Sequence, residues 1–142
     1  MGKKIYLAAQ YKQKNEIRQV AEILKREGHE IVSSWLDESY PPEVTLDQVP
    51  EEFLTDTACK DCTEILSADV FVLFTVDPAI ATTRGGRHVE FGFALSYPKK
   101  SLSIYILGPR ENIFHYLPSI KQCATVAELV KELKEEGKNA EI

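Results

Sequence analysis

The feature of this 142-residue sequence that most restricts its fold is an unbroken apolar run, Val70-Phe71-Val72-Leu73-Phe74, directly after Asp69. A strand with one face in water alternates apolar and polar residues, whereas a strand of a parallel sheet is covered on both faces and is apolar throughout. The run therefore predicts a central strand over 69–74, with helices packed on both of its faces.

The segments on either side of this run alternate between further short strands and amphipathic helices. The expected strands are 5–9, 29–35, 69–74, 101–107 and 123–126. The expected helices are 15–26, 51–67, 87–97 and 127–136. This alternation predicts one α/β domain over 1–142. Its fold is expected to be a doubly wound, flavodoxin-like or Rossmann-like parallel sheet of about five strands with helices on both faces.

Two segments carry finer expectations. The stretch 36–50 contains Pro41, Pro42 and Pro50, which predicts a long loop of the kind that is functional or mobile. The second helix is expected to turn one apolar face toward the core. That inner face would consist of Phe53, Leu54, Ala58, Cys62, Ile65 and Leu66.

Charge and apolar patterning exclude several function classes. The net charge is −5, from 17 basic and 22 acidic residues, which argues against a protein that binds duplex nucleic acid. No apolar run reaches the roughly 20 residues that span a bilayer. The opening Met1-Gly2-Lys3-Lys4 leads into neither a signal peptide nor a myristoylation signal. We therefore expect a cytoplasmic protein with no membrane partner.

Three cysteines raise the question of a metal or redox site. Cys59 and Cys62 form a CxxC pair within an expected helix, and Cys123 stands apart. A redox pair would be expected just after a strand, and a zinc site needs two more ligands at suitable spacing. We interpret these residues as reduced thiols, and no metal or organic cofactor is expected.

Ligands of doubly wound sheets bind at the carboxyl ends of the strands. The richest of these segments is 82–94, where Gly85-Gly86 precedes a helix that carries Glu90 in its first turn. An acid at this position is favoured by the helix dipole alone. Its basic neighbours Arg84 and Arg87, together with the small residues that follow it, indicate instead a carboxylate placed for chemistry.

Three segments together resemble the nucleoside 2-deoxyribosyltransferase family, whose relatives include nucleoside 5′-monophosphate N-glycosidases. The likeness extends from Lys4 to about Pro118. Its motifs are Ile5-Tyr6-Leu7-Ala8-Ala9, then Asp61 in the helix before Ala68-Asp69-Val70, and then Gly86-Arg87-His88-Val89-Glu90-Phe91-Gly92-Phe93-Ala94.

The resemblance implies a double displacement. Glu90 would attack the anomeric carbon and form a covalent glycosyl-enzyme, which a second base or water then resolves. Tyr6 would orient Glu90, and Asp61 would contact and help to protonate the departing base. Asn112 would reach into the site of a neighbouring subunit, so a homo-oligomer with a shared active site is expected.

Further positions are expected to bind the substrate. In the transferases a carboxylate six residues before the nucleophile holds the sugar 5′-hydroxyl, but here Arg84 takes this place. Arginine forms bidentate bonds with phosphate, so a 5′-monophosphate substrate is one hypothesis, and an ion pair of Arg84 with Asp77 or another loop acid is the other. Gln10 is a candidate for the base pocket, and Trp35 either stacks on the base or packs in the core. The remaining candidates are Ala8, Gly86, Arg87 and His88.

The leading hypothesis is therefore an enzyme that cleaves or transfers the N-glycosidic bond of a small nucleoside or nucleotide. A non-catalytic nucleotide-binding or sensing module with the same fold is the alternative, and replacement of Glu90 by alanine would distinguish the two. A flavodoxin-like regulatory domain with another ligand is a third hypothesis. It would place an acid cluster at the strand ends, which the mixed segment 82–94 fits poorly.

Overall fold

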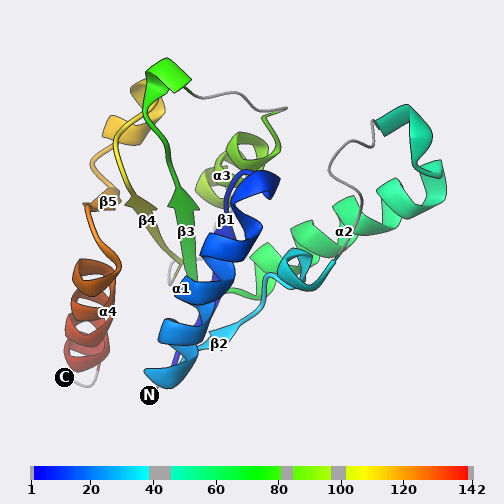
Figure 1. The fold of residues 1–142 in the computed structure, drawn as a ribbon. Coiled ribbons are helices and arrows are strands. Elements are labelled where there is room, and N and C mark those ends of the chain that lie inside the picture. The colour runs from blue at the N-terminus through cyan, green and yellow to red at the C-terminus, as the bar shows by residue number, and fades with distance from the viewer. Residues whose placement is uncertain (1, 39–45, 81–84, 97–101, 141–142) are drawn as a thin grey trace.

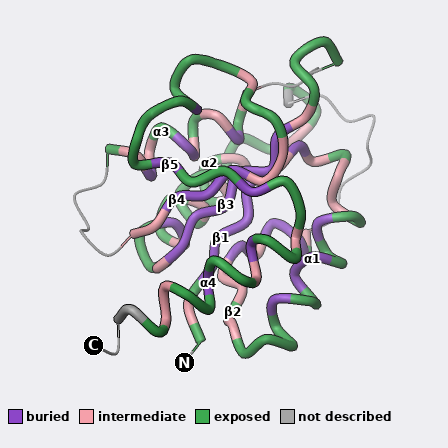
Figure 2. Tube along the Cα trace, turned by 90° about the vertical axis from the view of Figure 1, so that its left-hand side faces the viewer, coloured by how far each residue is buried: buried purple, intermediate pink, exposed green. Residues whose placement is uncertain are grey.

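The computed structural model describes residues 2–38, 46–80, 85–96 and 102–140 (Figure 1). In this part of the chain, five parallel strands form one sheet in the order β2-β1-β3-β4-β5. The strands are β1 (Lys4–Ala8), β2 (Glu30–Ile31), β3 (Val70–Phe74), β4 (Ser103–Leu107) and β5 (Ile120–Cys123). All of β3 is buried, as Figure 2 shows for the centre of the sheet, which confirms the expected central strand.

Four helices cover the sheet: α1 (Lys14–Arg26), α2 (Glu51–Ser67), α3 (Gly86–Ser96) and α4 (Val126–Ala140). The chain moves in one direction along the sheet from β1 to β2, and in the other direction from β2 to β3 and from β3 to β4. Right-handed crossovers therefore place α1 on one face and α2 and α3 on the other. Glu136 of α4 lies against Tyr105. Tyr105 is in register with Val72, and Val72 with Leu7, so these side chains lie on the α1 face of the sheet. Helix α4 therefore covers the same face as α1. The doubly wound α/β fold is therefore confirmed.

Two predicted strands end elsewhere than expected. β2 was predicted over 29–35 but pairs only at 30–31, and a 3₁₀ turn follows at Ser34–Asp37. Side chains end this strand: the Ser33 hydroxyl accepts the Leu7 N–H, and the Glu64 carboxylate accepts the Ser34 N–H.

β5 was predicted over 123–126 but lies at 120–123. Two side chains cap the start of α4: the Thr125 hydroxyl accepts the Glu128 N–H, and the Glu128 carboxylate accepts the Ala124 N–H. This capping arrangement begins the helix at Val126, a residue that was assigned to the strand.

The expected inner face of α2 is largely wrong. Ile65 is buried, but Phe53 is 42% exposed, Leu66 is 37% exposed and Cys62 is exposed. Figure 1 shows the reason, since α2 extends past the edge of the sheet and lacks a layer beneath its first half. No helix among the described residues is long and apolar enough to cross a membrane.

The carboxyl ends of β3 and β4 come close together at Gly108. Its φ of +125° lies in the region that favours glycine. A Cβ atom there would lie 2.5 Å from Thr75 Oγ1 and 2.8 Å from the Thr75 carbonyl oxygen. Glycine is therefore required at this edge, where the sheet delivers its ligand-facing loops.

Candidate active site

The candidate site is built around a contact between Tyr6 in β1 and Glu90 in α3. The Tyr6 ring is fully buried on the α2 and α3 face and is stacked on Phe71, with centroids 5.7 Å apart and planes within 6°. Its hydroxyl donates a short hydrogen bond to Glu90 Oε2. Phe91, the next residue of α3, packs on Phe71 and fixes the helix over the strands. The two residues that the sequence singled out as nucleophile and orienting group therefore lie in contact.

Burial raises the pKa of Glu90 to about 7, and the charges of Asp61 and Glu64 act in the same direction. The Tyr6 hydrogen bond opposes this shift by stabilising the carboxylate. Burial and the Glu90 charge in turn hold the pKa of Tyr6 far above its usual range, so this hydroxyl remains a donor.

Asp61 supplies a second carboxyl group from α2. Burial raises its pKa to about 6, helped by Glu38 and Glu64 and opposed by Lys60. Its Oδ1 atom is buried and has no hydrogen-bond partner. A carboxyl group whose pKa lies near 6 can take up or give up a proton close to neutral pH, and with its unused oxygen it is suited to general acid chemistry.

The surrounding acids were missed by the sequence reasoning. Glu64 Oε1 accepts the Ser34 N–H at 3.2 Å, which ties the end of β2 to α2. Glu38 forms an ion pair with Lys60 at 2.5 Å. The three-residue spacing of Asp61 and Glu64, which puts both on one face of a helix, was the available signal for Glu64.

Gln10 follows β1 and is only 4% exposed. Both its Oε1 and its Nε2 atoms lack a hydrogen-bond partner. Ala8, at the end of β1, is completely buried.

Trp35 lies in the core. Its indole N–H donates to the Leu7 carbonyl oxygen at 2.7 Å, and its ring is 8% exposed. This geometry matches the packing role that the sequence left open, and base stacking on Trp35 gains no support from it.

The basic residues are arranged differently from the expectation of a phosphate pocket. Arg87 is 3% exposed and forms a bidentate ion pair with Glu111, with distances of 2.5 and 2.7 Å. His88 is half-buried with Nε2 3.9 Å from Glu111, and burial lowers its pKa. Gly86 is an exposed residue at the start of α3, and Arg84 lies outside the described residues. The contact between Arg84 and a phosphate therefore stays a prediction.

Asn112 lies at the start of a 3₁₀ turn, Ile113–Tyr116, and its side chain accepts the Phe114 N–H at 2.9 Å. It borders a cavity of about 500 Å³, whose other lining residues are His88, Phe91, Gly92, Leu95 and Phe114. On a helical wheel the α3 residues of this lining point away from Glu90. The cavity therefore lies on the opposite side of α3 from the Tyr6–Glu90 pair.

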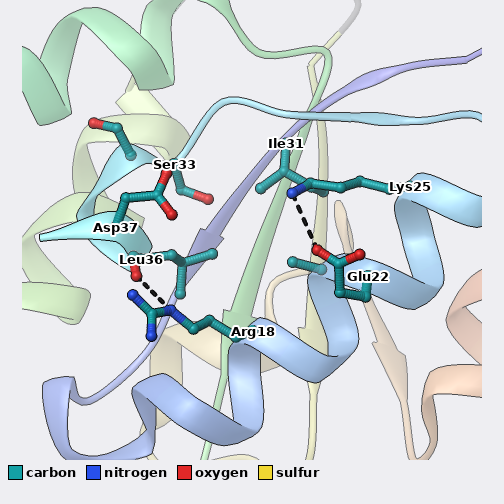
Figure 3. A pocket seen from close by; sticks show the side chains of 9 residues that line it. Arg18, Glu22, Lys25, Ile31, Ser33, Leu36 and Asp37 are labelled. Carbon is teal, nitrogen blue, oxygen red and sulfur yellow. Dashed lines mark hydrogen bonds and ion pairs between the residues drawn. The ribbon is translucent and has the colours of Figure 1, made fainter.

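A second cavity, of about 370 Å³, lies between α1 and the segment after β2 (Figure 3). Arg18 donates to the Leu36 carbonyl oxygen at 2.7 Å there, and Lys25 pairs with Glu22 at 3.3 Å. None of the carboxylates around Tyr6 lines this cavity, so it is separate from the candidate site.

Within the described ranges, no group of three or more histidine, cysteine or acidic side chains is placed to hold a metal ion. Cys59 and Cys62 are free and exposed, and Cys123 is free and buried.

Two solved structures share this fold. One is the CMP N-glycosidase BcmB of Clostridium botulinum, with 17% identity and a TM-score of 0.52 over 92% of this chain and 98% of that one. The other is a conserved protein from Enterococcus faecalis V583, with 14% identity and a TM-score of 0.59 over 96% and 99%. No protein-family model and no curated protein matches the chain. At these identities the likeness establishes the fold.

Proposed function

We propose that this protein breaks the N-glycosidic bond of a nucleoside or nucleoside 5′-monophosphate, with Glu90 as the nucleophile. The contact between the Tyr6 hydroxyl and the Glu90 carboxylate carries the proposal. It is supported by Asp61 on the adjacent helix, by the motif resemblance to the nucleoside 2-deoxyribosyltransferase family, and by the fold shared with a CMP N-glycosidase.

The chemistry requires the two carboxyl groups in opposite protonation states. Ionised Glu90 forms a bond to the sugar C1′ atom while the bond from C1′ to the base nitrogen breaks, and the base leaves with that electron pair. Protonated Asp61 transfers its proton to the base. Water, or a second base in a transfer reaction, then attacks C1′, gives up a proton to Asp61 and releases Glu90.

A shared active site in a homo-oligomer belongs to the same proposal. The turn beside Asn112 exposes several large apolar side chains close together in the sequence, and a group of exposed apolar side chains is typical of an interaction surface. These are Ile113 (77% exposed), Phe114 (57%), Tyr116 (66%) and Leu117 (40%). A second copy of the chain on this surface would bring Asn112 next to another subunit.

The direct test incubates the protein with a panel of deoxynucleosides, ribonucleosides and their 5′-monophosphates and measures free base by chromatography. Wild type is expected to release base, and Glu90→Gln is expected to lose at least about 10³-fold in kcat. Glu16→Gln, an exposed acid on α1, is the matched control. A glycosyl adduct on the peptide that contains Glu90, seen by mass spectrometry, would identify the intermediate.

Two further comparisons resolve the substrate and the acceptor. Faster reaction of monophosphates than of nucleosides is expected if Arg84 binds the phosphate. Formation of a new nucleoside after addition of a second base would indicate transfer. If wild type binds nucleotides but releases no base from any member of the panel, the protein is a binding or sensing module.

A further inference from the structure

Gln10 is a buried side chain whose polar atoms have no hydrogen-bond partner among the described residues. A glutamine carboxamide has one acceptor oxygen and a two-proton donor nitrogen. Among the residues that the structure describes, neither atom finds a partner, although Gln10 is only 4% exposed. Buried polar groups in native proteins are nearly always satisfied, so an orphaned carboxamide indicates a missing ligand.

Its position is the ligand-facing edge of the candidate site. Gln10 has extended backbone angles, φ −64° and ψ 136°, just beyond β1. Side chains alternate along a strand, so Tyr6 and Ala8 share one face of β1, and Gln10 follows two residues after Ala8, beyond the carboxyl end of that strand. That face is the one on which Tyr6 meets Glu90.

The residue next to Gln10, Tyr11, is linked by contacts to the side of the site that holds Asp61. The hydroxyl of the adjacent Tyr11 donates to the Glu38 carbonyl oxygen at 3.5 Å. The Glu38 carboxylate pairs with Lys60, which precedes Asp61 in α2, and it contributes to the raised pKa of Asp61. Among the described residues Asp61 Oδ1 is also buried without a partner, so α2 and the segment after β1 both hold unused polar atoms.

We propose that the Gln10 carboxamide reads the hydrogen-bonding edge of the substrate's nucleobase, and that it is the residue that determines specificity for the base. This inference rests on the proposed function, in which Asp61 faces the departing base. A base edge with a donor next to an acceptor matches both atoms of the amide at once. Because no group in the described part of the chain fixes the amide orientation, the residue can present its donor and acceptor in either order.

The test removes one hydrogen-bonding group from the base and one from the protein. The substrates are the deoxynucleosides of adenine and of unsubstituted purine, and of cytosine and of 2-pyrimidinone; each second member lacks the exocyclic amino group. Wild type is compared with Gln10→Met, which keeps the length of the side chain without its polar atoms. Gln19→Met, on the exposed side of α1, is the control.

Loss of the amino group is expected to lower kcat/KM by about 10- to 100-fold more in wild type than in Gln10→Met. The ratio of kcat/KM with and without the amino group is compared between wild type and Gln10→Met, so the intrinsic difference between the leaving groups cancels. Titration calorimetry with the free bases repeats the comparison without any chemical step. The melting temperature of Gln10→Met is expected to rise by roughly 2–8 °C, because the substitution removes two unsatisfied buried atoms.

The outcomes separate this inference from the proposed function. Equal discrimination in wild type and Gln10→Met overturns the role of Gln10 even if the protein cleaves nucleosides. Base binding that depends on Gln10, without base release, supports the role of Gln10 and overturns the enzymatic proposal. A protein that neither binds nor releases bases overturns both.

Discussion

Tyr6 and Glu90 shift each other's pKa in opposite directions. The hydrogen bond from Tyr6 lowers the pKa of Glu90, whereas the Glu90 charge raises that of Tyr6. Tyr6 therefore acts on the proposed reaction through Glu90, as a positioning residue that favours the ionised nucleophile.

Removal of this hydroxyl should move the pH profile. In Tyr6→Phe the pKa of Glu90 is expected to rise above about 7, so the acid limb of kcat/KM against pH shifts upward and the rate at pH 7 falls by about 10-fold or more. The ring keeps its stacking on Phe71, so the fold should persist. Glu16→Gln, at an exposed acid on α1, serves as control. An acid limb that stays in place or moves down would contradict the assigned role of Tyr6.

The raised pKa of Glu90 also predicts how stability depends on pH. Between its ordinary value of 4.5 and about 7, the folded protein binds more protons than the unfolded chain. Stability therefore falls as pH rises through this window, and the penalty is complete above pH 7. Glu90→Gln should be more stable than wild type at pH 8 by roughly 1–3 kcal/mol, and nearly equal to it at pH 4. Urea denaturation at the two pH values checks this, and a constant difference would refute it.

At the scale of single elements, α3 is held at its first turn by the ion pair between Arg87 and Glu111. Both charged groups are removed from water, and Glu111 also accepts the Val76 N–H at 3.2 Å. The pair thereby links α3 to the segments that follow β3 and β4, the same edge on which Glu90 is presented.

Loss of either Arg87 or Glu111 should leave the other charge buried without its ion-pair partner. Arg87→Met is expected to lower the free energy of unfolding by about 3–5 kcal/mol, and the double variant Arg87→Met with Glu111→Leu should recover part of the loss. Denaturant titration of the single and double variants measures the coupling. A single variant as stable as wild type would show that the pair is not needed to hold α3.

The sequence predicts elements well where one periodicity decides the structure. The apolar run of β3 is found as expected. Helical spacing over 15–26 predicts one buried stripe of Ile17, Val20, Ala21, Ile23 and Leu24; in α1 four of these are buried, whereas Ile23 is 39% exposed. The ends of β2 and β5 were wrong because side chains there bond to the backbone. Of these bonds, the one from Glu64 to Ser34 joins residues 30 positions apart, and only the Thr125–Glu128 capping pair was visible locally.

The same distinction between local patterns and contacts of distant residues applies to the candidate site. Tyr6 and Glu90 were linked through motif resemblance, and they lie in contact. The partner of Arg87 is 24 residues away at Glu111, so the sequence offered Arg87 as free for a substrate. Likewise, the isolation of Gln10 is a property of the packed interior, which no local pattern records.

At the scale of the whole molecule, exposed apolar residues on the Ile113–Tyr116 turn predict self-association. Light scattering after size exclusion is expected to give a mass at least twice the 16.1 kDa of the chain. Phe114→Asp should shift this mass toward the monomer, whereas Ile23→Asp on α1 should not. A monomeric wild type at high concentration would refute the shared site.

The weak burial of α2 has a consequence for enzymology at low concentration. This helix carries Asp61, yet Ile65 is the one residue of α2 that is buried, and polar contacts such as that of Glu64 with Ser34 help to hold the helix. In the proposed assembly, contacts from another copy would hold this helix and the proposed proton donor in place. Specific activity would decline on dilution and return on reconcentration, so turnover measured at nanomolar protein would understate that of the assembled enzyme.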